Sequence, residues 1–122
     1  MTEPLRKVRL DDAAAARPEY WSQEVVGRAN GSLFKVAKGT GSTEWHAHAD
    51  MDEVFVVTAG TLVVELRDGE VALEPGELVV VPRGVEHRPV ASAGAQILLI
   101  EPEGTVNTGD AGGALTAPER EL

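Results

Sequence analysis

Residues 46–60 read HAHADMDEVFVVTAG, and residues 76–87 read GELVVVPRGVEH. Both stretches contain short runs of valine, leucine and phenylalanine between turn-forming residues. Such runs are typical of buried β-strands. All three histidines of the chain lie in these two stretches. The stretches therefore predict both the fold class and the place of a functional site.

Strand and turn signals continue on both sides. Asn-Gly and Asp-Gly favour two-residue turns between strands. They predict two hairpins: Asn30-Gly31 between residues 23–29 and 32–38, and Asp68-Gly69 between residues 61–67 and 70–73. Further strands are expected at 43–48, 53–58, 78–81, 85–90 and 96–101, with a loop at 39–42. About eight or nine short strands at this spacing indicate an all-β sandwich or small barrel.

Length and composition agree with this fold class. The chain has 122 residues, 43% of them hydrophobic, with 13 glycines and 7 prolines, which suits one turn-rich domain. It has no cysteine, so disulfides, zinc ribbons and thiol nucleophiles are excluded. One short helix is predicted at 11–17, where two aspartates precede four alanines and Pro18 follows Arg17. The expected division is an N-terminal arm (1–19), a barrel (20–101) and a C-terminal extension (102–122).

Charge and hydropathy limit the partners. Twenty acidic and eleven basic residues give a formal net charge of −9, which argues against nucleic acid as a partner. No apolar run reaches the roughly 18 residues of a membrane span, and the N-terminus lacks an apolar signal sequence. A cytoplasmic location without membrane contact is therefore expected. The strands at 54–57 and 78–81 are apolar on both faces, which indicates a double-layered barrel and favours a homodimer.

The histidines and one glutamate form a candidate metal site. His46 and His48 are two residues apart on an expected strand, so both imidazoles would point to one face. Glu53 begins the next strand, and pairing of strands could bring His87 alongside. Nitrogen and oxygen ligands of this kind suit one divalent transition metal: Fe, Mn, Ni, Co, Cu or Zn. Taken alone, a His-x-His pair is more often a polar surface feature.

The spacing resembles the two motifs of the cupin family. The first motif matches at His46, His48, Glu53 and Gly60, and the second at Gly76, Pro82, Gly84 and His87. Two positions depart from the pattern: Thr40 stands where a glycine is usual, and Ala91 where an asparagine often closes the second motif. The resemblance covers residues 20–101. It implies a double-stranded β-helix, a jelly-roll-like barrel, with His46, His48, Glu53 and His87 as metal ligands.

The chain is further similar to the small single-domain microbial cupins described as mannose-6-phosphate isomerase-like. That similarity includes the run from Glu101-Pro102 to Gly109-Asp110, and it implies that the C-terminal extension packs on the barrel rim. Resemblance to some cupin dioxygenases implies that Glu53 can also act as a base.

Alternation along the strands outlines a pocket. If His46 points inward, Glu44 does too and Trp45 points outward. The expected inner wall is apolar: Phe55, Val57, Leu62, Val64 and Leu66. Either face of the strand at 96–101 can be the inner one. Glu44 and Gln96 are therefore candidate polar contacts, with surface exposure as the alternative, in a cavity suited to a small molecule.

These features favour a metal-dependent enzyme acting on a small organic molecule, whether an oxygenase, an isomerase or a lyase. The alternative is a non-catalytic small-molecule-binding or accessory protein. A structural barrel with a vestigial site is a third hypothesis, against which the complete ligand set weighs.

Overall fold

The computed structural model describes residues 5–104 and the backbone of residues 120–121. One short helix precedes a series of strands, as the sequence predicts. The elements are α1 (Leu10–Ala15), β1 (Glu24–Ala29), β2 (Ser32–Ser42), β3 (Glu53–Ala59), β4 (Leu62–Leu66), β5 (Gly69–Leu73), β6 (Leu78–Val81), β7 (His87–Pro102) and β8 (Arg120–Glu121). The predicted all-β class is confirmed.

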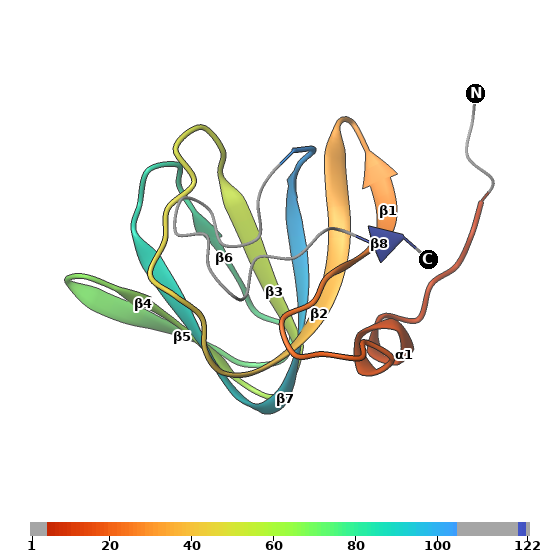
Figure 1. Cartoon of the computed structure of the whole chain (residues 1–122), viewed down its shortest axis with the longest axis horizontal. Coiled ribbons are helices and arrows are strands. Elements are labelled where there is room, and N and C mark those ends of the chain that lie inside the picture. The colour runs from red at the N-terminus through yellow and green to blue at the C-terminus, as the bar shows by residue number, and fades with distance from the viewer. Residues whose placement is uncertain (1–4, 105–119, 122) are drawn as a thin grey trace.

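The strands form one curved sheet in the order β5-β4-β7-β2-β1-β8, and β3 pairs with both β6 and β7 (Figure 1). Every pairing is antiparallel except β1 with β8. β7 is central, because it pairs with β2, β3 and β4. The sheet therefore curves round β7 into the small barrel that the resemblance implies.

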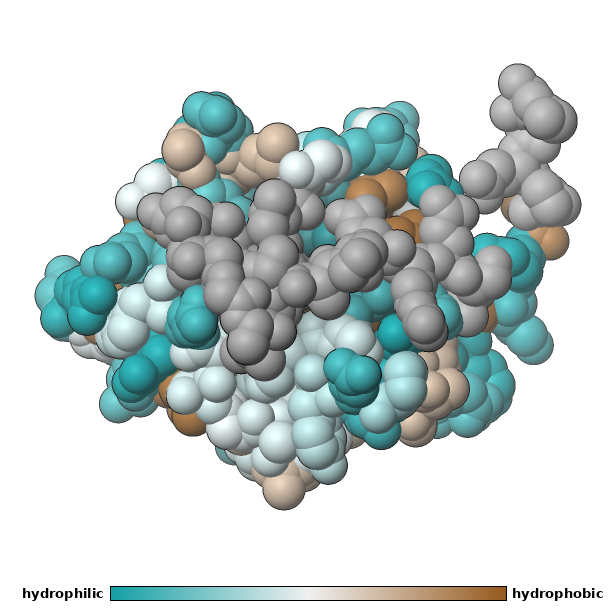
Figure 2. All heavy atoms as spheres, in the orientation of Figure 1, coloured by the Kyte–Doolittle hydropathy of each residue, from teal (hydrophilic) through white to brown (hydrophobic). Residues whose placement is uncertain are grey.

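The barrel interior is apolar. The predicted inner wall is confirmed for Phe55, Val57, Leu62 and Val64, each at most 3% exposed, while Leu66 is half-buried against them. Of the two faces of β7, the inner one carries Ala95, Ile97 and Leu99. A second cluster, Ala13, Ala14, Val26 and Val36, fixes α1 outside the sheet beside β2. Among the coloured residues in Figure 2, hydrophilic and intermediate ones predominate, and hydrophobic ones form only small patches.

Both predicted hairpins are present, the first with its turn at the predicted residues. Ala29 pairs with Ser32, and the two residues between them have positive φ, 52° at Asn30 and 76° at Gly31. Two-residue turns that match the twist of the strands need this conformation, and Asn-Gly adopts it readily. The second hairpin closes where Leu66 pairs with Gly69, so its turn is Arg67-Asp68 and not the predicted Asp68-Gly69, and Gly69 is the first residue of β5.

Three predictions about the strands are wrong. Residues 39–42 belong to β2 and are not a loop, because a bulge between Gly39 and Gly41 keeps them paired with β7. The strands expected at 85–90 and 96–101 are one strand, β7, in which Gly94 has a φ of 71°. Residues 43–48 form no strand: only His46 makes an isolated bridge, to His87.

The end of the helix also differs from the prediction. Arg17 lies beyond α1 rather than in its last turn. Its side chain is 4% exposed and pairs with Glu24, with 2.9 Å between Nη1 and Oε1. Arg17 thus ties the segment after α1 to β1 instead of offsetting the helix dipole.

The predicted packing of the C-terminal extension on the barrel rim falls on residues 105–119, which lie outside the described residues. In the part of the chain that the structure describes, no helix is long and apolar enough to cross a membrane.

Candidate metal centre

Backbone hydrogen bonds fix the segment that carries His46 and His48. The His46 N–H donates to the His87 carbonyl at 3.0 Å, and the His87 N–H donates to the His46 carbonyl at 2.9 Å. The Gly84 N–H donates to the His48 carbonyl at 2.8 Å. The segment is therefore held against β7 and the preceding turn, although it forms no strand of its own.

The four residues from the two motif stretches meet in one buried cluster. Each of His46, His48, Glu53 and His87 offers one ligand atom, and these atoms all lie within 4.8 Å of one another. None of the four residues is more than 8% exposed. Glu53 begins β3 and His87 begins β7, so two neighbouring strands present their first residues to the same point.

Two carbonyl groups orient the imidazoles. Nδ1 of His46 lies 2.8 Å from the Glu44 carbonyl, and Nδ1 of His87 lies 2.9 Å from the Val85 carbonyl. A carbonyl only accepts, so each Nδ1 carries the proton and each Nε2 keeps a free lone pair. Metal-binding histidines are commonly fixed in this way.

The atoms at the centre of the cluster lack hydrogen bonds. Nε2 of His48 and of His87 lie 3.3 and 3.4 Å from Glu53 Oε1. Neither these nitrogens nor the two carboxylate oxygens have a hydrogen-bond partner. Buried polar atoms without partners are rare and destabilising. A metal ion bound between them would satisfy all of them, and the donor set fits such an ion.

Burial and neighbouring charges set the state of these groups. Burial lowers the pKa of His46, which favours the neutral imidazole that a metal requires. Burial alone would raise the pKa of Glu53, but contacts with His48, His87 and Glu101 lower it below its usual range. The cluster thus combines a neutral imidazole with an ionised carboxylate.

Sequence reasoning did not identify two buried charged residues near Glu53, which lie on β2 and β7. Lys35 and Glu101 are 0% and 1% exposed, and the Lys35 ammonium pairs with Glu101 Oε1. Burial and the adjacent Glu53 raise the pKa of Glu101 to about 9. A signal was available: Lys35 alternates with Leu33 and Ala37, both of them core positions.

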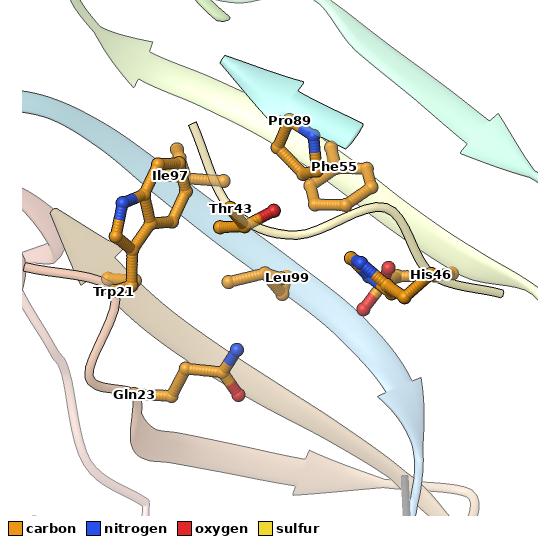
Figure 3. A pocket seen from close by; sticks show the side chains of 10 residues that line it. Trp21, Gln23, Thr43, His46, Phe55, Pro89, Ile97 and Leu99 are labelled. Atoms are coloured by element: carbon orange, nitrogen blue, oxygen red, sulfur yellow. The ribbon is translucent and has the colours of Figure 1, made fainter. Parts of the chain in front are cut away.

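An apolar pocket adjoins the cluster. It is small, with a volume of about 20 Å³, and it is lined by Trp21, Gln23, Ala37, Thr43, His46, Glu53, Phe55, Pro89, Ile97 and Leu99. In the view of Figure 3, Trp21 and Ile97 lie at one end and His46 at the other. Oε1 of Gln23 is buried without a hydrogen-bond partner. Gln23 is therefore a candidate polar contact that sequence reasoning missed.

Trp21 is held in an unusual conformation at this pocket. Its φ is 68°, its N–H donates to the Lys38 carbonyl at 2.7 Å, and its indole N–H donates to the Thr40 carbonyl at 3.1 Å. The ring covers Gly39 so closely that a Cβ there would lie 2.7 Å from it. Positive φ at a non-glycine residue often marks a functional site.

The other candidate residues separate into two groups. Phe55 lines the pocket. The Glu44 side chain is exposed, and its carbonyl rather than its carboxylate contacts His46. Gln96 is half-buried on the face of β7 opposite Ile97. Neither Glu44 nor Gln96 lines the pocket, because the backbone at 43–48 is irregular and β7 turns its other face inward.

Comparisons with known proteins agree with the geometry. The family described as "Cupin domain" matches residues 32–101. A cupin-2 domain containing protein of Shewanella frigidimarina has a solved structure that is 41% identical, with a TM-score of 0.75 over 79% of this chain and 94% of that one. Uncharacterized protein YdbB of Bacillus subtilis is 34% identical over 52% of this chain. An acireductone dioxygenase of Rhodopseudomonas palustris is 29% identical over 71%. The chain spans 57% and 59% of the last two proteins.

Proposed function

The chain belongs to the cupin family, and from this membership and its buried cluster we propose that it is a metal-dependent enzyme acting on a small organic molecule. One observation carries the proposal: three imidazoles and a carboxylate converge within 4.8 Å beside an apolar pocket that two of them line, His46 and Glu53. Among the reaction classes, we place oxygenase before isomerase and lyase because of the similarity to an acireductone dioxygenase.

Different residues of the chain would hold the metal, exclude water, bind the substrate and act as the base. A divalent metal held by His46, His48, Glu53 and His87 would supply a Lewis acid or redox centre with positions left for substrate oxygens. Phe55 and other apolar residues would exclude water. The buried Oε1 of Gln23 would accept a hydrogen bond from the substrate. Of the described residues that line this pocket, Glu53 alone carries a carboxylate, so it is also the proposed base.

We further propose that the protein is a homodimer. Leu78 and Val80 of β6 are 59% and 49% exposed, and they pair with Val56 and Val54 of β3. An apolar outer sheet face of this kind suits a second copy of the same chain. The cytoplasmic location stays a prediction.

Elemental analysis tests the metal first. Protein purified without added metal should carry about one divalent transition metal per chain, as a site with four protein ligands predicts. Protein that holds almost none and gains none on incubation with Fe²⁺, Mn²⁺ or Zn²⁺ would contradict the proposal.

Oxygen uptake then tests the reaction. The metal-loaded chain should consume dioxygen when acireductone, the substrate in the name of the relative, is supplied. A metal-loaded chain that binds small molecules without converting them would instead support the non-catalytic alternative.

A further inference from the structure

Three buried ionisable side chains lie in a row across three adjacent strands. Lys35 is on β2, Glu101 on β7 and Glu53 on β3, and β7 pairs with both of the other strands. In the register, Leu33 lies opposite Glu101 and Val54 lies opposite Ile100. This places Glu101 between Lys35 and Glu53, on the inner face.

An ion pair and a strand pairing connect the row from end to end. The Lys35 ammonium forms an ion pair with Glu101 Oε1. Glu53 and Glu101 are the next residues beyond the Val54–Ile100 pair of β3 and β7, so they lie side by side on neighbouring strands. None of the three residues is more than 2% exposed. Removing ions from water carries a large desolvation penalty, so a buried pair is weak evidence for a stabilising role. Its position beside a proposed metal ligand points to a role at the site.

We propose that Lys35 and Glu101 are positioning residues, which hold the Glu53 carboxylate toward the three imidazoles. The proposal rests on the proposed metal function. Carboxylates that bind metals are themselves hydrogen-bonded by neighbouring groups, which orient them. Glu101 is the carboxyl group beside Glu53 on the neighbouring strand, and the ion pair with Lys35 holds Glu101 in place.

Lys35 has a separate part in the arrangement. Two neighbouring carboxyl groups inside a protein repel each other when both are ionised. The Lys35 ammonium, paired with Glu101, offsets that repulsion. Lys35 therefore acts on Glu53 through Glu101, and losing either residue should weaken metal binding in the same direction.

Zinc affinity, measured by competition with a chromophoric chelator, tests the proposal without any assay of activity. Glu101→Met keeps the size of the side chain but removes its hydrogen bonds, and zinc should bind about 10- to 100-fold more weakly. Glu101→Gln keeps an acceptor for Lys35 and presents an amide donor to Glu53, so it should bind zinc nearly as tightly as the wild type. Lys35→Met should weaken zinc binding as well.

A matched control separates positioning from general destabilisation. Val36 is the neighbour of Lys35 on β2, is 1% exposed, and packs in the other apolar cluster, away from the site. Val36→Ala should lower the free energy of unfolding and leave zinc affinity unchanged. Should Val36→Ala weaken zinc binding as much as Glu101→Met, the positioning role is wrong.

The remaining outcomes are also decisive. If Glu101→Met does not fold, the double variant Lys35→Met/Glu101→Met replaces both charges with apolar groups, which proteins often tolerate. It should fold and show the same zinc loss. Wild-type affinity in Glu101→Met or the double variant, or equal losses in Glu101→Gln and Glu101→Met, overturns this inference alone. A wild-type chain that binds no zinc or other divalent metal overturns the proposed function and this inference together.

Discussion

His46 and His87 are joined by two reciprocal backbone hydrogen bonds, of 3.0 and 2.9 Å, and their ring centroids lie 4.4 Å apart. The bonds fix an otherwise irregular segment to the start of β7. Main-chain geometry thus sets the distance between two of the proposed ligands. Ligands that the fold has already placed favour metal affinity, because little has to be ordered on binding.

Replacing one ligand should remove the metal and leave the fold. We expect His48→Ala to lose most of its bound metal, because three donor atoms would remain in place of four. Far-UV circular dichroism should be unchanged. Glu44→Ala is the control: its carboxylate is exposed and only its carbonyl contacts His46, so metal content should stay at the wild-type level. Undiminished metal in His48→Ala would mean that the ligand set is wrong.

Two glycines with the same backbone conformation should differ in their tolerance of a side chain. Gly31 and Gly60 have φ of 76° and 72°, but a Cβ on Gly31 meets no atom within 4 Å, whereas one on Gly60 lies 2.9 Å from Ala95 Cα. Gly31→Ala should lower the free energy of unfolding by about 1–2 kcal/mol through backbone strain. Gly60→Ala should lower it further. Urea unfolding measures both, and equal losses would contradict the close approach at Ala95.

A methyl group at Gly39 should displace the tryptophan at the pocket. In Gly39→Ala the new Cβ would lie 2.7 Å from the Trp21 ring, so the ring must move. In a Trp45→Phe background, where Trp21 is the remaining tryptophan, we expect a shift in the emission maximum. Gly27→Ala adds a Cβ at an ordinary 3.8 Å from Phe34 and should leave the emission unchanged. An unshifted spectrum in Gly39→Ala would argue against this packing.

The proposed dimer predicts a change of mass in solution. Leu78→Asp places a charge in the apolar outer face of β6, where the residue is 59% exposed, and should convert dimer to monomer. Val71→Asp places the same charge on β5, at a residue 37% exposed, and should leave the dimer intact. Analytical ultracentrifugation distinguishes the two. A monomeric wild type would refute the dimer.

Local signals in the sequence predicted the hairpins and the meeting of His46, His48, Glu53 and His87. Asn30-Gly31 adopts positive φ with little strain, so its turn depends on two residues alone. The four residues of the candidate metal site could also be predicted from the sequence. Their spacing along the chain matches the two cupin motifs, and this match requires no three-dimensional information. Features that depend on a few residues or on motif spacing can therefore be predicted without knowledge of the packing.

Pairing across the sheet could not be predicted in the same way. Residues 85–90 and 96–101 were predicted as separate strands. They are joined in β7 because β2 continues to pair with β7 on both sides of the bulge between Gly39 and Gly41. The roles of Lys35 and Glu101 depend on β7 lying between β2 and β3. Charged residues are rarely buried unless paired. Alternation with Leu33 and Ala37 points to Lys35 alone, and the register of three strands is needed to identify Glu101 as its partner beside Glu53.

The central position of β7 has a consequence for folding kinetics. All three of its partners, β2, β3 and β4, precede it in the chain, and Ser32 pairs with Pro102. Contacts between residues so distant in sequence form slowly. Because β7 also carries His87, the ligand set is complete only after this late closure. We therefore expect bound metal to slow unfolding while leaving the folding rate nearly unchanged.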